Sequence, residues 1–114
     1  MGITRYRFGE IEIDGRTYTA DVIITPQRVV DTWWRKQGHN LALADLAEIM
    51  AAKPDILVVG TGYYGRMAIP DETRRYLRAQ RVSLHDAHTG EAVKAFNRLQ
   101  RESARVVAAL HLTC

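Results

Sequence analysis

Two apolar runs constrain the fold of this chain more than any other feature of its sequence. Residues 56–59 are Ile-Leu-Val-Val, and residues 106–112 are apolar apart from His111. Runs of this kind, without alternating polar positions, are typical of strands that are covered on both faces, as in parallel sheets flanked by helices. The chain is therefore expected to bury at least two strands in the middle of an α/β sheet.

Three helices are expected around these runs. Apolar residues recur at helical spacing from residue 43, and this helix must end before Pro54, because the residue preceding a proline is pushed out of the helical region. Pro70, followed by two carboxylates, marks the start of a second helix. A third helix is predicted over residues 89–103, with a strand over residues 82–86 before it.

The first third of the chain is predicted to form antiparallel β-structure. Apolar and charged residues alternate from Tyr6, and a second β-rich run covers residues 18–24. The Asp14-Gly15 step between them can supply the positive φ angles of a tight hairpin turn. A further strand is expected over residues 29–34.

The order of elements predicts the fold class. An antiparallel β-hairpin followed by α-β-α-β-α-β indicates a mixed α/β fold with a mainly parallel sheet, because strands that alternate with helices are joined by right-handed crossovers. Neither a repeat nor a long linker divides the 114 residues, so residues 1–114 are predicted to form a single domain.

Composition narrows the classes of partner. A net charge of +3 favours acidic partners, but 13 carboxylates against 16 Lys and Arg make a mixed surface, so nucleic acid is an unlikely partner. The single cysteine excludes an internal disulfide, and no apolar run reaches the ~20 residues of a membrane span. The cytoplasm is the expected compartment, and the sequence does not specify an oligomeric state.

A glycine-rich string follows the first apolar run. Gly60, Gly62 and Gly65 have the G-x-G-x-x-G spacing of dinucleotide-binding loops, but that site needs a helix to start at the loop, and Pro70 starts the helix late. The alternative is a structural turn. In that case Gly60 and Gly62 are predicted to adopt φ angles that a Cβ atom disfavours.

If the three strands are parallel, their carboxyl ends meet at one edge, where open α/β sheets bind ligands. The expected ligand-binding residues are Gly60, Thr61, Gly62, Tyr63, Gly65, Asp86, His111 and Cys114. The alternative is that the histidines are solvated or structurally hydrogen-bonded. No metal site is predicted, because the histidines and the cysteine lack closely spaced pairs, and no cofactor is predicted either.

Two basic stripes lie on the predicted second and third helices. Their spacing of three and four residues places the cations of each helix on one face, opposite its apolar face. They are either solvated faces or a surface for an acidic protein partner. The residues concerned are Arg74, Arg78, Lys94, Arg98 and Arg101.

Over nearly its full length the chain resembles the Mth-type domain family. The matching landmarks are Asp14-Gly15 with Tyr18, Asp21-Val22 before Pro26, Trp33-Trp34-Arg35, Gly38-His39, Gly60-Thr61-Gly62, Pro70, Ala92-Val93 before Asn97, and the closing His111-Leu112-Thr113-Cys114. The resemblance implies a three-layer fold and no established reaction, and one mitochondrial branch of the family assembles a membrane complex through protein contacts. Tyr63-Tyr64 is bulkier than the family pattern, so the shape of a pocket at this loop is expected to differ.

Two hypotheses of function follow. The first is a non-catalytic protein-interaction or assembly module, since no complete acid-base or nucleophile set is present. The alternative is a small-molecule-binding protein or enzyme that uses a pocket at the carboxyl ends of the strands, with residues 60–65, Asp86 and His111. Neither a substrate nor a partner can be identified from the sequence.

Overall fold

Five strands form the central sheet of the structure, a computed structural model that describes residues 2–103 and 105–114. Their order across the sheet is β5-β4-β8-β6-β7. The strands β6 (Ile56–Gly60), β7 (Ser83–Ala87) and β8 (Val106–Leu110) are parallel, whereas β4 (Val22–Ile24) and β5 (Val29–Asp31) add antiparallel pairings. The predicted α/β class is confirmed, and the sheet is mixed.

A second, antiparallel sheet contains β1 (Ile3–Arg7), β2 (Glu10–Ile13) and β3 (Arg16–Tyr18). The turn between β2 and β3 has positive φ angles at Asp14 (49°) and Gly15 (81°), as the Asp-Gly step predicts. The antiparallel β-structure expected for the first third of the chain is therefore present.

The helices lie close to their predicted positions. A 3₁₀ turn over Leu43–Leu46 precedes α1 (Ala47–Ala51), so the first predicted helix is only partly α-helical. The second helix, α2, covers Asp71–Ala79 and starts directly after Pro70. The third, α3, covers Thr89–Glu102.

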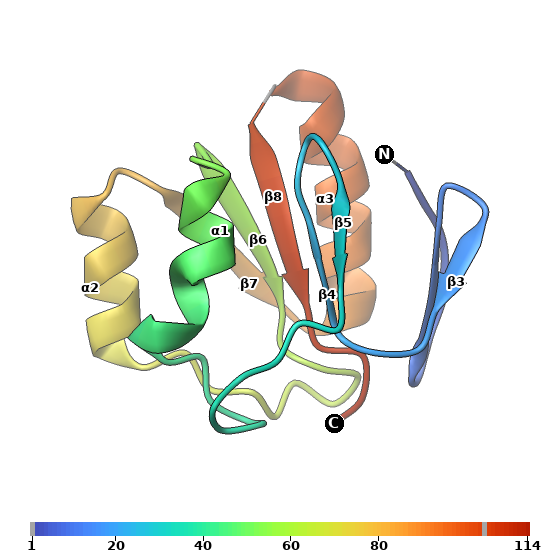
Figure 1. The fold of residues 1–114 in the computed structure, drawn as a ribbon, viewed down its shortest axis with the longest axis horizontal. Helices are drawn as coiled ribbons and strands as arrows, with labels where there is room; N and C mark the ends of the chain where they lie inside the picture. The colour runs from blue at the N-terminus through green and yellow to red at the C-terminus, as the bar shows by residue number, and fades with distance from the viewer. Residues whose placement is uncertain (1, 104) are drawn as a thin grey trace.

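The elements form three layers (Figure 1), with α1 and α2 on one side of the central sheet and α3 with the small sheet on the other. Side chains of β6 alternate between the two cores, because successive residues of a strand point to opposite faces: Leu57 and Val59 join the α1/α2 core, and Val58 joins the α3 core. All five residues of β8 are buried. Because both faces of the sheet are covered, β6 and β8 contain no polar side chains.

Two expected strands differ from the structure. The run over residues 18–24 is divided, because β3 and β4 belong to different sheets. The strand expected to reach Trp34 ends at Asp31, where Thr32 adopts a φ of 65° and turns the chain. Trp33 N–H then donates to the carbonyl of Asp21 at 2.7 Å instead of continuing the ladder.

Candidate functional site

The carboxyl ends of the three parallel strands lie side by side at one end of the sheet, as the sequence predicts. The amide of His111 donates to the carbonyl of Gly60 at 3.0 Å, and the amide of Thr61 donates to the carbonyl of Ala87 at 2.9 Å. The structure therefore brings the glycine-rich loop, the end of β7 and the segment after β8 together.

Thr89, the first residue of α3, joins these strand ends and was missed by sequence reasoning. Its buried hydroxyl donates to the carbonyl of His111 at 2.6 Å and accepts from the amide of Gly62 at 2.9 Å. Gly60 packs directly against it, so that a Cβ atom at Gly60 would lie 2.7 Å from Thr89 Oγ1. The available signal in the sequence was a threonine at the predicted start of a helix that directly follows a strand.

Four of the five amides over residues 61–65 donate within the chain. Tyr63 N–H donates to the carbonyl of Thr113 at 2.6 Å, Arg66 N–H to Cys114 at 3.0 Å, and Gly65 N–H to Gly62 at 3.2 Å. Phosphate binding by such a loop needs free amides at a helix start, and α2 begins only at Asp71. The loop has the geometry of a turn that is hydrogen-bonded to the half-buried Cys114.

The aromatic residues of this loop lie on the surface. Tyr63 and Tyr64 are exposed, and the ring of Tyr63 packs against Tyr64 and Phe8, with centroid distances of 5.0 and 5.8 Å. Beside them, the hydroxyl of Tyr6 donates to the carbonyl of Leu112 at 2.9 Å. Burial raises the pKa of Tyr6 to about 12, so this hydroxyl stays protonated at neutral pH.

His111 belongs to a buried ionic cluster that also contains Asp21 and Arg35. Asp21 Oδ2 lies 2.8 Å from both Arg35 Nη2 and His111 Nδ1, and Arg35 Nη2 also donates to the carbonyl of Gly38 at 2.8 Å. The Arg35 guanidinium stacks over the Trp33 ring, 4.6 Å from its centroid. Of this cluster, sequence reasoning placed only His111 at a site; the others appeared only as family landmarks.

The contacts of Asp21 hold it ionised. Burial raises the pKa of its carboxyl group, but hydrogen bonds from His111, the amide of Leu112 and Arg35 outweigh burial and lower that pKa below its ordinary value. A buried charge is tolerated only when it is paired and hydrogen-bonded in this way.

Asp86 does not join His111. Its carboxylate pairs with Arg74 of α2, at 3.0 and 3.2 Å, on the partly exposed outer side of β7. The hydrogen bond to Asp86 raises the pKa of Arg74. The residues expected to form one ligand site are thus divided: His111 pairs with Asp21, whereas Asp86 of the edge strand β7 pairs with Arg74 of α2.

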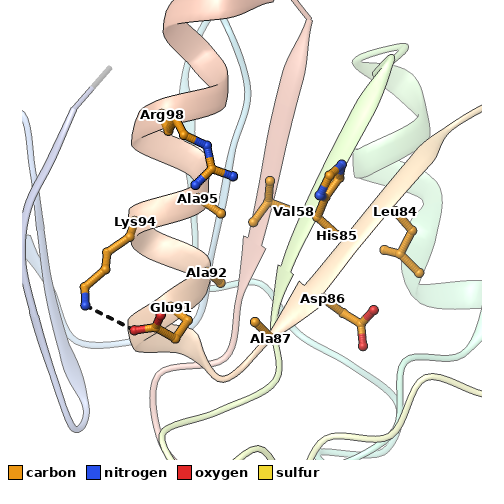
Figure 2. A pocket seen from close by; sticks show the side chains of 10 residues that line it. All are labelled: Val58, Leu84, His85, Asp86, Ala87, Glu91, Ala92, Lys94, Ala95 and Arg98. Carbon is orange, nitrogen blue, oxygen red and sulfur yellow. Dashed lines mark hydrogen bonds and ion pairs between the residues drawn. The ribbon is translucent and has the colours of Figure 1, made fainter.

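A groove lies between the edge strand β7 and helix α3 (Figure 2). Its volume is about 520 Å³. Its floor contains Val58, Ala92 and Ala95, whereas Lys94 and Arg98 lie along the helix side and His85 lies on the strand. Glu91 and Asp86 also line it, but each is paired, with Lys94 and Arg74 respectively, so Arg98 is the cation of the groove without an ion pair among the described residues.

A smaller groove of about 230 Å³ lies against α2, on the other side of β7. It is lined by Arg74, Arg78, Val82 and Leu84. Four of the five residues predicted as a partner surface thus line the two grooves beside β7, and Arg101 is exposed farther along α3.

Two further observations bear on the site. Among residues 2–103 and 105–114, no three histidine, cysteine or acidic side chains are grouped closely enough to hold a metal ion. Within the same residues, no helix has the length and apolar character needed to cross a membrane.

Several solved structures resemble this one. The conserved hypothetical protein PH1505 from Pyrococcus horikoshii OT3 is 27% identical, with a TM-score of 0.83 over 100% of both chains. The Rpa2829 protein from Rhodopseudomonas palustris is 29% identical, with a TM-score of 0.78 over 96% of this chain and 81% of that chain. A Bordetella pertussis protein described as an Mth938-like domain shares the fold at 23% identity and a TM-score of 0.71, over 97% of this chain and 85% of that chain.

A family model also matches the chain over residues 3–111, and its description is a protein of unknown function, DUF498/DUF598. This match includes every strand and helix that the structure describes. The resemblance to Mth-type domains is thereby confirmed, and the chain belongs to the DUF498/DUF598 family.

Proposed function

We propose that this chain is a protein-interaction module that binds an acidic, extended segment of a partner along the free edge of β7. The observation that carries the proposal is that basic side chains flank one edge strand on both sides. Arg74 and Arg78 come from α2, and Lys94 and Arg98 come from α3. The two basic stripes predicted from the sequence thus converge on one strand.

The backbone of β7 supports strand addition. In a parallel sheet, the N–H and C=O groups of alternate residues point to opposite neighbours. Ser83 N–H donates to Asp55 and the Ala87 carbonyl accepts from Thr61, so these residues face β6. Leu84 and Asp86 therefore present their backbone groups at the outer edge, as in domains that bind peptides by β-augmentation.

The two grooves provide the specificity. Side chains of an added strand alternate between its faces, so they would enter the α3 groove and the α2 groove in turn. Within the part of the chain that the structure describes, Arg78 and Arg98 form no ion pair, whereas Lys94 pairs with Glu91 and Arg74 with Asp86. Carboxylates of an acidic strand are the complementary partners for Arg78 and Arg98.

A peptide titration tests the proposal. The probe is a short fluorescent peptide with the repeat Glu-Glu-Val-Val, which places carboxylates on both faces of an added strand, and its lysine-valine counterpart is the negative control. We expect Arg98→Glu to weaken binding of the acidic peptide about fivefold or more, because reversing one exposed charge changes the binding free energy by about 1 kcal/mol. Binding should also weaken as salt is added.

Arg101→Glu is the matched control, since it makes the same charge change on the same exposed helix outside both grooves. Amide hydrogen exchange then tests the mode of binding: the amides of Leu84 and Asp86 should become protected. Equal losses for Arg98→Glu and Arg101→Glu, or tighter binding of the lysine peptide, would contradict the proposal.

Assembly of a larger complex, as the family resemblance implies, would be one use of such strand addition. A pocket with enzymatic activity receives less support, because four of the five amides over residues 61–65 are bonded within the chain and Asp86 pairs with Arg74. The cytoplasm remains the predicted compartment.

A further inference from the structure

Three buried nitrogen atoms without a hydrogen-bond partner lie in one cluster of side chains. They are Trp33 Nε1, Arg35 Nη1 and His111 Nε2, and no other buried side-chain nitrogen or oxygen within residues 2–103 and 105–114 lacks a partner. The side chains touch: the Arg35 guanidinium stacks on Trp33, and Arg35 Nη2 lies 3.0 Å from His111 Nδ1. Because buried polar groups are normally paired, three exceptions in one place point to a common ligand.

The acceptors within the cluster are already used. Asp21 Oδ1 accepts from the amide of Leu112 at 2.8 Å, and Oδ2 accepts from Arg35 and His111. The two hydrogens of Arg35 Nη2 are directed to Asp21 and to the carbonyl of Gly38, so His111 Nδ1 carries the proton that it donates to Asp21. The cluster therefore needs a further acceptor.

The remaining groups define the chemistry of that acceptor. Arg35 Nη1 has two N–H groups to donate and Trp33 Nε1 has one. The single carboxylate of the cluster, Asp21, is shared by Arg35 and His111. The two oxygen acceptors of a carboxylate complement these free N–H groups, as carboxylates complement arginine in general.

We propose that Trp33 and Arg35, next to His111, form a binding site for a small carboxylate. This site is independent of the peptide-binding edge, because it uses none of the residues that line the grooves beside β7. The carboxylate accepts from Arg35 Nη1 and Trp33 Nε1, and Asp21 keeps the guanidinium in position.

The segment after β5 controls access to this site. The three nitrogen atoms are shielded from solvent, and the ring of the exposed His39 packs on the ring of His111, with a centroid distance of 5.7 Å. Hydrogen bonds hold this segment at its ends, where Trp33 N–H donates to Asp21 and Leu41 N–H donates to Ala68, and also at His39, whose carbonyl accepts from Ala68 N–H. Because the nitrogen atoms are shielded, a small carboxylate is favoured over a large one.

The two tryptophans allow a direct test by NMR. Trp33 is buried, and the neighbouring Trp34 is 76% exposed, so their two indole N–H signals report on the site and on the surface in the same sample. Sodium formate is the probe, and sodium chloride at equal ionic strength is the control. We expect formate to shift the Trp33 signal saturably, with no matching shift of the Trp34 signal, and acetate to bind more weakly than formate.

Two variants complete the test. Trp34→Phe assigns the signals and should leave the formate response of Trp33 unchanged. Arg35→Lys keeps a positive charge but removes Nη1, and should abolish the saturable shift in protein whose amide spectrum remains folded. The proposal is overturned if Trp33 and Trp34 shift equally, if chloride gives the same response, or if Trp33 does not respond to formate in the wild-type protein.

Discussion

Replacing Gly62 with valine is expected to destabilise the domain by at least about 3 kcal/mol, because two unfavourable terms add at this position. Gly62 adopts a φ of 112°, which side-chain-bearing residues rarely occupy. A Cβ atom there would also overlap the main chain of Cys114 and lie 2.8 Å from the carbonyl oxygen of Thr113. Backbone atoms held by the loop cannot move aside as a flexible side chain can.

Thermal unfolding measures this effect, and the melting temperature should fall by about 12 °C or more. Gly15→Val is the matched control, since Gly15 has a φ of 81° but no atom within 4 Å of the added Cβ. It should cost only about 1 to 2 kcal/mol, from the backbone conformation alone. If both variants lose the same stability, crowding by Cys114 is not the cause.

Asp21→Asn is expected to cost roughly 3 kcal/mol at neutral pH, because it leaves the buried guanidinium of Arg35 without a compensating charge. The side chain of Arg35 is only 4% exposed, so water cannot replace the carboxylate. Urea unfolding gives the free energy difference. Asp86→Asn removes the partly exposed pair with Arg74 and should cost at most about 1 kcal/mol.

Comparison of the wild-type protein with Asp21→Asn should also show a pH dependence of stability. The pKa of Asp21 is lowered in the folded state, so its contribution to stability is fully present above the unfolded pKa of about 3.9 and is lost as pH falls through the folded value. When the pH falls below about 3.9, the wild-type protein should therefore lose more free energy of unfolding than Asp21→Asn does. Parallel losses for both proteins would show that Asp21 does not titrate with a lowered pKa.

The φ angles predicted for Gly60 and Gly62 agree with the structure at one position and not at the other. Both were expected to need φ angles that a Cβ atom disfavours, and Gly62 does. Gly60, however, has no positive φ; it lacks room because Thr89 and Leu110 pack against it, with Leu110 Cδ2 3.0 Å from an added Cβ. The glycine pattern indicates a requirement, but it cannot separate backbone conformation from crowding by residues distant in sequence.

Local patterns were sufficient for most of the secondary structure. The buried strands β6 and β8, the Asp14-Gly15 hairpin and the starts of α2 and α3 follow from hydrophobic runs, turn residues and a proline, which act over a few neighbouring residues. The spacing of the arginines likewise determined that each helix has one basic face. These features depend on residues that are close together in the chain, so they can be predicted from a single sequence.

Only the tertiary structure decided which of these features lie together. The two basic faces flank the same strand because β7 lies at the edge of the sheet, next to β6 and between α2 and α3 in the chain. The contact between Asp21 and His111 spans 90 residues, and that between Arg35 and His111 spans 76. No local periodicity encodes such contacts, because they arise when antiparallel β4 pairs with β8 and brings the two ends of the chain into one core.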